Sequence, residues 1–283
     1  MIWIAGRQVN PMMLQDWGLN DVQQEIVHRM AASRDVFEYA SEDVLRFELK
    51  LRDHLVKSAR ALYMSGIAFS DFENSRSNPE FWEQTELGGF RLRPGVPPSR
   101  GIIDIFQNGN LYATECATAM VIILYHAVLQ SIREADFERL FADIVLYDWR
   151  YDQDLNLQTL PTDTFLPGDI LYFANPDYDR SKPQWQGENA VFLGRGLYYG
   201  HGAGIRTAPS LIAFLNENRE PGATRSAYLV SQATRPGFAS LAPFDNGRES
   251  FWYVYRNEGI PGGPFLQTGG RIMAAIGSQF WEG

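Results

Sequence analysis

The stretch TECATAMVIILYHAVLQSI, residues 114–132, decides how the rest of this chain is interpreted. Its run from Cys116 to Leu129 is apolar apart from Thr118 and His126. An apolar run of about 14 residues is too short to cross a bilayer, which needs roughly 20 residues in a helix. The stretch therefore predicts a helix buried inside the fold.

Cys116 stands at the start of this expected helix and is the only cysteine of the chain. A single cysteine excludes an intramolecular disulfide and a cysteine-rich zinc or iron–sulfur site. Free N–H groups and the helix dipole favour a thiolate at a helix N-terminus and can lower the pKa of the thiol. A free cysteine is otherwise most often a small buried apolar residue. Two interpretations follow, and the position at the first helical turn favours a nucleophile over a core residue.

The composition indicates an ordinary globular protein. The chain has 283 residues, of which 45% are hydrophobic and 21% charged, and its formal net charge is −9. This charge disfavours nucleic acid or an anionic membrane surface as the main partner. The four histidines are scattered without metal-site spacing, and the opening MIWIAG is too short for a secretion signal. We therefore expect a soluble intracellular enzyme with no metal, no cofactor, no nucleic acid and no membrane partner.

Helical patterns precede strand patterns along the chain. Ser41 is expected to cap the strongest helix and Gly66 to end it, while Ser99 and Ser210 are expected to cap two shorter ones. The expected helical segments are residues 21–30, 42–65, 99–106, 115–132, 134–143 and 210–216. The expected strands are residues 144–149, 165–173, 189–194, 198–201 and 227–232. Helices followed by an antiparallel sheet give an α+β pattern.

One catalytic domain is expected over residues 1–240, because no linker rich in serine, glycine or proline interrupts it. Residues 241–283 then form a C-terminal extension, in which residues 251–255 have a strand-like pattern. The segment 259–270 holds five glycines and two prolines. The sequence assigns no function to this extension.

A second informative segment is LPGDILYF, residues 166–173. It resembles the strand that follows the cysteine helix in NlpC-type members of the papain-like superfamily, in which the next strand carries a histidine base. The matching stretch here is ENAVFLG, so Glu188 stands where that histidine would be, and the following strand supplies His201. The resemblance implies a papain-like core: a nucleophile at the N-terminus of a buried helix packed on an antiparallel sheet, plus N-terminal helices.

A glutamate partner changes the chemistry expected of Cys116. A carboxylate and a thiolate are like charges, so we expect the resting pair to share one proton. Glu188 can act as a base only if burial raises its pKa from about 4.3 toward neutrality. Trp149 and Trp185 are the residues expected to provide apolar surroundings.

Six separated segments resemble the Bacillus-type spore-coat transglutaminases, in order and at matching spacing over roughly residues 1–235. They are TECATA (114–119), LYDW (146–149), GDILYF (168–173), QWQGEN (184–189), HGAGI (201–205) and SAYLVSQATR (226–235). The resemblance implies that Cys116 is the nucleophile, Glu188 its catalytic partner and Glu115 a partly interchangeable second carboxylate. Residues implied to line the active-site passage are Phe69, Trp149, Tyr172, Trp185 and His201.

The activity implied by this resemblance is acyl transfer without calcium. Cys116 would form a thioester with a protein glutamine, ammonia would leave, and a lysine amine would give an Nε-(γ-glutamyl)lysine cross-link. The family implies coat proteins as partners, synthesis in the mother-cell cytoplasm and association with the spore coat, and we expect a monomer. A glutamine deamidase or peptidoglycan amidase on the same scaffold is the main alternative. A non-catalytic coat or scaffold protein with a buried cysteine is another.

The implied site residues also have structural alternatives. Glu115 is consistent with a carboxylate that stabilises the positive end of the helix. His201 is consistent with hydrogen bonds that orient a strand, and it is implied as a catalytic participant only by the resemblance. The aromatic residues of the passage are consistent with ordinary core positions. The remaining histidines are expected to be surface or core residues: His28, His54 and His126.

Overall fold

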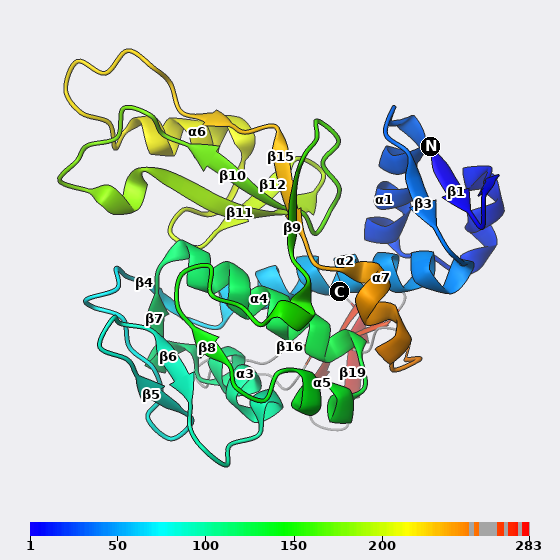
Figure 1. The fold of residues 1–283 in the computed structure, drawn as a ribbon, viewed down its shortest axis with the longest axis horizontal. Coiled ribbons are helices and arrows are strands. Elements are labelled where there is room, and N and C mark those ends of the chain that lie inside the picture. Colours follow the sequence, from blue (N-terminus) through cyan, green and yellow to red (C-terminus); the bar gives the residue numbers. More distant parts are fainter. Residues whose placement is uncertain (249–251, 255–264, 269–270, 277–278, 283) are drawn as a thin grey trace.

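The computed structural model describes residues 1–248, 252–254, 265–268, 271–276 and 279–282, and side chains as far as residue 248 apart from residue 15. Helices and antiparallel sheets are combined in it, as the α+β pattern predicts (Figure 1). The α-helices in this part of the chain are α1 (Asp21–Ala32), α2 (Glu42–Met64), α3 (Pro98–Gln107), α4 (Cys116–Ser131), α5 (Glu134–Leu140), α6 (Ala208–Asn216) and α7 (Phe238–Leu241).

The largest sheet has the strand order β13-β12-β11-β10-β15-β9, with β14 also paired to β10, and every pairing in it is antiparallel. Its strands are β9 (Gln158–Pro161), β10 (Ile170–Ala174), β11 (Gly187–Gly194), β12 (Leu197–Gly200), β13 (Gly204–Thr207), β14 (Tyr228–Leu229) and β15 (Gln232–Arg235). Smaller sheets are formed by β1 (Ile2–Ile4), β2 (Arg7–Gln8) and β3 (Phe37–Tyr39), by β4 (Ala68–Phe69) and β7 (Ala113–Thr114), and by β5 (Trp82–Gln84), β6 (Phe90–Leu92) and β8 (Val145–Leu146).

The large sheet lies between two apolar layers. Successive side chains of a strand point to opposite faces, and Ile170 and Val191 accordingly belong to the core formed with α2 and α4. Leu171 and Ala190 belong to a second core on the other face, which α6 covers (Figure 1). The central strands β10 and β11 are therefore mostly buried, whereas the edge strand β9 is exposed, and α4 lies next to β11.

Helix α4 is apolar on all sides because it is surrounded by other elements, and its residues from Ala117 to Leu129 are buried. Two histidine–serine hydrogen bonds join it to α2: His54 Nδ1 lies 2.7 Å from Ser131 Oγ, and His126 Nδ1 lies 2.8 Å from Ser58 Oγ. Burial lowers the pKa of His126 to about 3, so it is neutral. The core interpretation of these two histidines is confirmed. No helix of the part of the chain that the structure describes is long and apolar enough to cross a membrane.

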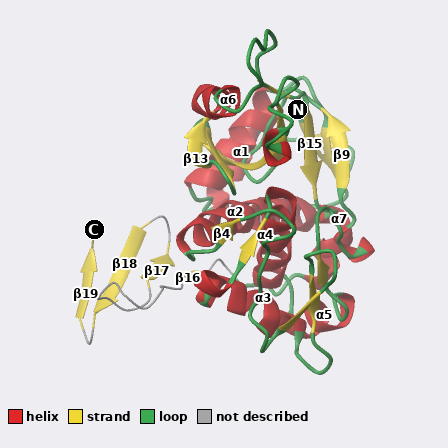
Figure 2. Ribbon diagram, turned by 90° about the vertical axis from the view of Figure 1, so that its left-hand side faces the viewer, coloured by secondary structure: helices red, strands yellow, loops and turns green. Residues whose placement is uncertain are grey.

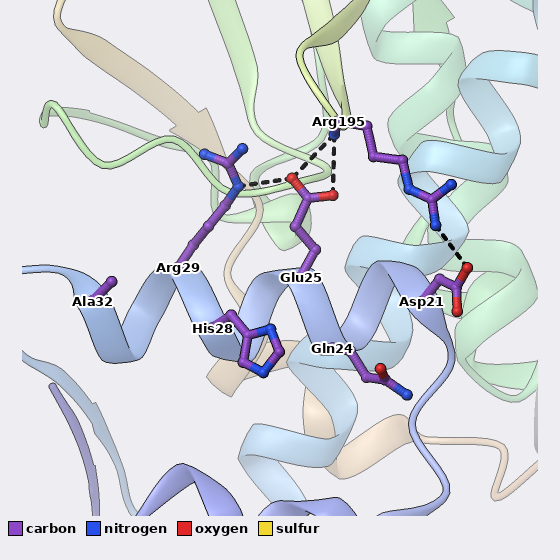
Figure 3. A pocket seen from close by; sticks show the side chains of 7 residues that line it. All are labelled: Asp21, Gln24, Glu25, His28, Arg29, Ala32 and Arg195. Atoms are coloured by element: carbon purple, nitrogen blue, oxygen red, sulfur yellow. Dashed lines mark hydrogen bonds and ion pairs between the residues drawn. The ribbon is translucent and has the colours of Figure 1, made fainter.

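Helix α1 packs against the N-terminal sheet and is held to the β11–β12 turn of the large sheet (Figures 1 and 3). The Arg195 backbone N–H in that turn donates to the Glu25 carboxylate at 3.0 and 3.1 Å, and Arg29 Nε donates to it at 2.8 Å. Arg195 also pairs with Asp21 at 2.7 Å. The hollow that Figure 3 shows is thus lined by charged groups that already neutralise one another.

Two expected helix caps are wrong. Helix α3 begins at Pro98 without a side-chain cap, because proline already has the dihedral angle needed at the first helical position, and the Ser99 hydroxyl bonds Glu134 instead. Helix α6 is capped by Thr207, whose hydroxyl accepts from the Ser210 backbone N–H. The predicted caps of α2 are confirmed: Ser41 accepts from the Val44 N–H, and Gly66 follows the helix with a φ of +85°.

Two expected strands are also shorter than their apolar runs. The run 165–173 becomes a strand only at Ile170, because Gly168 takes a φ of +87° in a turn directly before it. The run 144–149 yields only β8, and it joins the small β5-β6-β8 sheet instead of the large one. The expected strand 227–232 is split into β14 and β15.

The turn before β10 is fixed by a buried ion-pair network around Asp169. Its carboxylate accepts from Arg52 Nη1 at 2.7 Å, from Arg235 Nε and Nη2 at 2.8 Å, and from the Leu166 backbone N–H at 2.9 Å. Burial alone would raise the pKa of Asp169, but the two guanidinium charges outweigh it and hold the pKa below its usual value. The aspartate of the PGD segment thus joins α2, β10 and β15.

Replacing Asp169 with asparagine is expected to lower the free energy of unfolding by about 3–5 kcal/mol, since it leaves two guanidinium groups, Arg52 and Arg235, with Glu48 as the one remaining carboxylate among these partners. Urea unfolding at pH 7 measures this. The matched control is Asp21→Asn, which removes an ion pair whose side chains are 76% and 75% exposed and should change stability by less than about 1 kcal/mol. Because its folded-state pKa is lowered, the Asp169 contribution should be lost as pH falls through the acid range. Equal losses in the two variants would contradict the prediction.

The C-terminal extension contains a four-stranded antiparallel sheet of β16 (Trp252–Val254), β17 (Phe265–Thr268), β18 (Arg271–Ile276) and β19 (Gln279–Glu282), visible in Figure 2. The strand expected at 251–255 is confirmed for its three central residues. Part of the glycine- and proline-rich segment, residues 259–264 and 269–270, lies outside the described residues. The division into a domain of residues 1–240 and an extension stays a prediction.

Candidate active site

Cys116 is the first residue of α4 and is separated from the end of β7 by Glu115 alone. Strand β7 pairs in parallel with β4, so that Thr114 lies opposite Phe69. This pairing brings an aromatic side chain from a distant part of the chain to the turn that carries the thiol. The Cys116 side chain itself is partly exposed.

Glu115 is the N-cap of α4. Its two carboxylate oxygens accept from the backbone N–H groups of Ala117 and Thr118, the latter at 2.7 Å. Burial raises the pKa of Glu115, although these hydrogen bonds oppose the shift. The capping role, which the sequence left as one alternative, is therefore present. Its second role, as a substitute catalytic carboxylate, stays a prediction.

The thiol of Cys116 has a raised pKa, and the expectation of a lowered one is wrong. Burial is the largest cause, followed by the negative charges of Glu188 and Glu115. The helix N-terminus does not compensate, because the Glu115 carboxylate already occupies the N–H groups of the first turn. The resting thiol is therefore neutral.

Glu188 is completely buried, and its pKa is raised to about 8. Burial is the main cause, and the charge of Glu115 adds to it. One oxygen, Oε1, accepts from the Gly202 N–H at 3.3 Å, while Oε2 has no hydrogen-bond partner among the described residues. The condition that the sequence set for a glutamate base, a pKa near neutrality, is met.

His201 lies in the same cluster, but both of its ring nitrogens are engaged. Nε2 is 3.1 Å from the Ala68 carbonyl oxygen, and Nδ1 is 3.0 Å from the Tyr199 hydroxyl. Because a carbonyl only accepts, the proton belongs on Nε2 and the tyrosine donates to Nδ1. Burial lowers the pKa of His201 to about 4. The side chain is thus neutral and joins β12 to β4, and its proposed catalytic participation stays a prediction.

Two stacked aromatic rings lie against Gly202, whose N–H donates to Glu188. Trp185 stacks on Phe69 with ring centroids 5.0 Å apart, and it also meets Phe214 nearly at right angles, with centroids 4.9 Å apart. The loop that carries Trp185 is fixed by buried Asn175, whose Nδ2 donates to the Trp185 carbonyl at 2.9 Å. The remaining tryptophan, Trp149, packs against the main core. The apolar surroundings predicted from Trp185 are therefore present, and the role predicted for Trp149 stays a prediction.

Tyr172 and Asn189 face each other across β10 and β11 and lie next to the thiol. Burial is the main cause of the raised pKa of Tyr172, and the charge of Cys116 is the second. Asn189 Nδ2 donates to Cys116 Sγ at 3.6 Å. Asn189 was not singled out from the sequence, although its place directly after Glu188, at the start of the apolar run 190–193, was a usable signal. No group of three or more histidine, cysteine, aspartate or glutamate side chains in the described part of the chain could hold a metal ion.

Three glycines leave space for the side chains of the site, and this too was not predicted. A Cβ at Gly187 would lie 2.1 Å from the Tyr172 hydroxyl oxygen, and a Cβ at Gly202 would lie 2.7 Å from Trp185. A Cβ at Gly200 would lie 2.6 Å from Glu188 Oε1. Real Cβ atoms do not approach so closely, so each glycine fixes where its neighbour can lie.

Substituting Gly200 with alanine is expected to push the Glu188 carboxylate out of place and to lower turnover by about 10²-fold, since displacements near 1 Å have effects of that order. An amine-incorporation assay on purified protein measures the loss. Gly237→Ala is the control, because a Cβ there is similarly crowded, 2.4 Å from Ser240 Oγ, but outside the site. It should lower stability and leave the activity of folded protein unchanged. Full activity of Gly200→Ala would contradict the prediction.

A cysteine at a helix N-terminus, with a thiol pKa raised by burial and by the charge of a buried glutamate that itself has a near-neutral pKa, is the arrangement expected of a cysteine enzyme of acyl transfer. Comparison with known proteins then gives the family. The chain belongs to the protein-glutamine gamma-glutamyltransferase family, whose sequence model matches residues 1–245. This confirms the family resemblance found in the sequence.

Individual relatives agree with this assignment. The chain is 48% identical to the protein-glutamine gamma-glutamyltransferase of Bacillus mycoides (strain KBAB4) over 213 residues, which are 75% of this chain and 77% of the relative. It is 46% identical to the enzyme of that name from Bacillus anthracis (strain CDC 684 / NRRL 3495), with the same coverage. Its structure is similar to that of a transglutaminase from Geobacillus stearothermophilus without its C-terminal extension, with a TM-score of 0.71 and 52% identity over 74% of this chain and 100% of that one.

Proposed function

We propose that this protein is a cross-linking acyltransferase that joins glutamine and lysine side chains of proteins through a thioester at Cys116. The observation that carries this proposal is the fully buried Glu188, whose pKa of about 8 lets it exchange protons near neutral pH. Its charge also raises the pKa of the Cys116 thiol, so the two groups are close enough to interact. Family membership supplies the reaction class. The mechanism below follows from these groups.

In the first half-reaction the Cys116 sulfur attacks the side-chain amide carbon of a glutamine. The thiol proton passes to ionised Glu188 as the S–C bond forms, because the raised thiol pKa keeps the thiol protonated until attack. Protonated Glu188 then gives a proton to the amide nitrogen, the C–N bond breaks, and ammonia leaves. The product is a γ-glutamyl thioester.

In the second half-reaction a neutral lysine amine attacks the thioester carbon. Glu188 takes the amine proton, the C–S bond breaks, and the sulfur leaves and is reprotonated. The product is an Nε-(γ-glutamyl)lysine bond. Water competes with the amine at this step, and the stacked Phe69 and Trp185 rings restrict its access.

The main rival is a glutamine deamidase or amidase on the same scaffold, in which water is the acceptor. A glutamine-bearing protein and a fluorescent primary amine separate the two, with ammonia release and amine incorporation measured together and a chelator present in one arm. Incorporation that matches ammonia release supports the transferase, and equal rates with the chelator support calcium independence. Ammonia release without incorporation would establish the hydrolase.

The proposal extends to the fold and to the biological setting. For the fold, the helix that begins at Cys116 shares an apolar core with the antiparallel strands β10 and β11, which supports a papain-like, NlpC-type core. We further propose a monomer made in the mother-cell cytoplasm and acting at the spore coat, with coat proteins as glutamine and lysine donors. Labelling of coat extracts with the fluorescent amine tests this partner class, and an absence of labelled coat proteins would refute it.

A further inference from the structure

The Cys116 sulfur receives a hydrogen bond from one side chain among the described residues, and that side chain is not a carboxyl group. Asn189 Nδ2 donates to Sγ at 3.6 Å, a distance suited to the large sulfur atom. Glu188 influences the thiol through its charge, but no hydrogen bond joins it to Sγ in the described residues. The amide is therefore the group in direct contact with the reacting atom.

The position of Asn189 is fixed by the large sheet. It lies in β11 opposite Tyr172 of β10, with fully buried Val191 two residues further along the same face. Sites on strands are held more precisely than sites on loops. Asn189 is half-buried, as Cys116 is.

The charges around the thiol show what this amide supplies. Two carboxyl groups, Glu115 and Glu188, disfavour a thiolate, and Glu115 occupies the helix N–H groups that would otherwise stabilise one. The backbone and side chain of Asn189 act in the opposite sense and favour the thiolate. Hydrogen bonds to a charged acceptor are stronger than those to a neutral one. The contact therefore strengthens as the sulfur loses its proton.

We propose that Asn189 is a catalytic residue whose side-chain amide stabilises negative charge on the Cys116 sulfur while the thiol proton moves to Glu188. The S–H bond breaks, the proton joins the Glu188 carboxylate, and the electron pair left on sulfur forms the S–C bond to the substrate carbonyl. When the acyl group is transferred away, the same amide receives the returning charge. The identity of the substrate in this step rests on the proposed function, whereas the effect of Asn189 on the thiol does not.

Alkylation by iodoacetamide tests the proposal directly, because Cys116 is the only cysteine and no other thiol contributes to the signal. The rate is measured as a function of pH for the wild type, Asn189→Ala and Asn189→Asp. Loss of the donor should raise the pH midpoint of alkylation by about one unit, which lowers the thiolate fraction about tenfold at a fixed pH below it. A smaller side chain alone would admit the reagent more easily and increase the rate, so the two effects have opposite signs.

Asn189→Asp has the same size as the wild-type residue and places a further negative charge beside the sulfur, so it should show a larger shift. It also decides the matter if Asn189→Ala does not fold. The matched control is Asn216→Ala, which removes an amide that donates to Ser226 Oγ at 3.0 Å on the other side of the sheet. It should leave the midpoint unchanged.

Amine incorporation is measured on the same proteins and should fall about tenfold or more in both Asn189 variants. An unchanged alkylation midpoint in folded Asn189 variants would overturn the proposal, whatever their turnover. If the wild type incorporates no amine but the midpoint still shifts, the transferase assignment fails while the role of Asn189 at the thiol stands.

Discussion

Replacing Cys116 with alanine should reduce amine incorporation to background, a loss of about 10⁴-fold or more, because no other nucleophile can form the thioester. Both ammonia release and amine incorporation depend on that intermediate, so they should disappear together. The measurement is the coupled ammonia and fluorescent-amine assay on purified protein. Iodoacetamide labelling should also vanish, since the chain has no second cysteine.

Serine at position 116 provides the matched control for shape. It keeps a hydroxyl nucleophile of nearly the same size, but a hydroxyl is a far weaker acid than a thiol, and Glu188 with its pKa of about 8 cannot readily deprotonate it. We expect it to be inactive with the thermal stability of the wild type. Substantial turnover in either variant would refute the thioester mechanism.

Replacing Glu188 with glutamine should lower turnover by at least about 10²-fold, the range expected for lost acid–base catalysis. Glutamine keeps the shape and can still accept from the Gly202 N–H, so the loss reports the proton-transfer function. Glu115→Gln is the comparison, because it retains part of the helix cap and should lower turnover less than tenfold. Near-wild-type activity of Glu188→Gln would transfer the catalytic role to Glu115 or His201.

The pH dependence provides a second test of Glu188. A carboxyl group is a base only when ionised, so kcat/KM of the wild type should rise with pH up to about 8 and then level off. The Glu188→Gln variant should lack this rise. The stability of the wild type should change with pH in the opposite direction. The pKa of Glu188 is raised in the folded state, so the protonated carboxyl group stabilises the fold at low pH. This contribution is lost as pH rises through about 8. Thermal unfolding above pH 8 should therefore find the variant more stable.

Local pattern was sufficient for the elements that carry the chemistry. The almost entirely apolar run after Cys116 predicted a buried helix, and the residues of α4 from Ala117 to Leu129 are indeed buried. The side chain of Ser41 and the conformational freedom of Gly66 determined the ends of α2. The spacing of six motifs identified the family, and the substitution of a histidine by Glu188 predicted a carboxyl group of raised pKa.

Predictions failed where a second residue competed for the same backbone positions and the hydrophobic and capping patterns of the sequence did not reveal it. The thiol pKa is raised instead of lowered, because Glu115 occupies the N–H groups that the dipole argument assigned to Cys116. Ser99 and Ser210 lost their capping roles because Pro98 could begin one helix by itself and Thr207 preceded the other. At α4 and α6 a neighbour in the sequence accepted from the helix N–H groups, whereas at α3 the fixed φ of Pro98 began the helix without a side-chain cap.

The sequence by itself predicted the nucleophile, its helix and the identity of the acidic partner, because these depend on residue type and on contacts within a few positions, and the structure confirms the helix. Only the tertiary structure decided what surrounds them. The donation from Asn189 to Cys116 spans 73 residues, and the bond that ties His201 to Ala68 spans 133 residues. Such contacts are set by which strands pair and in what register, and a register is fixed by the packing of both sheet faces at once. No local pattern contains that information.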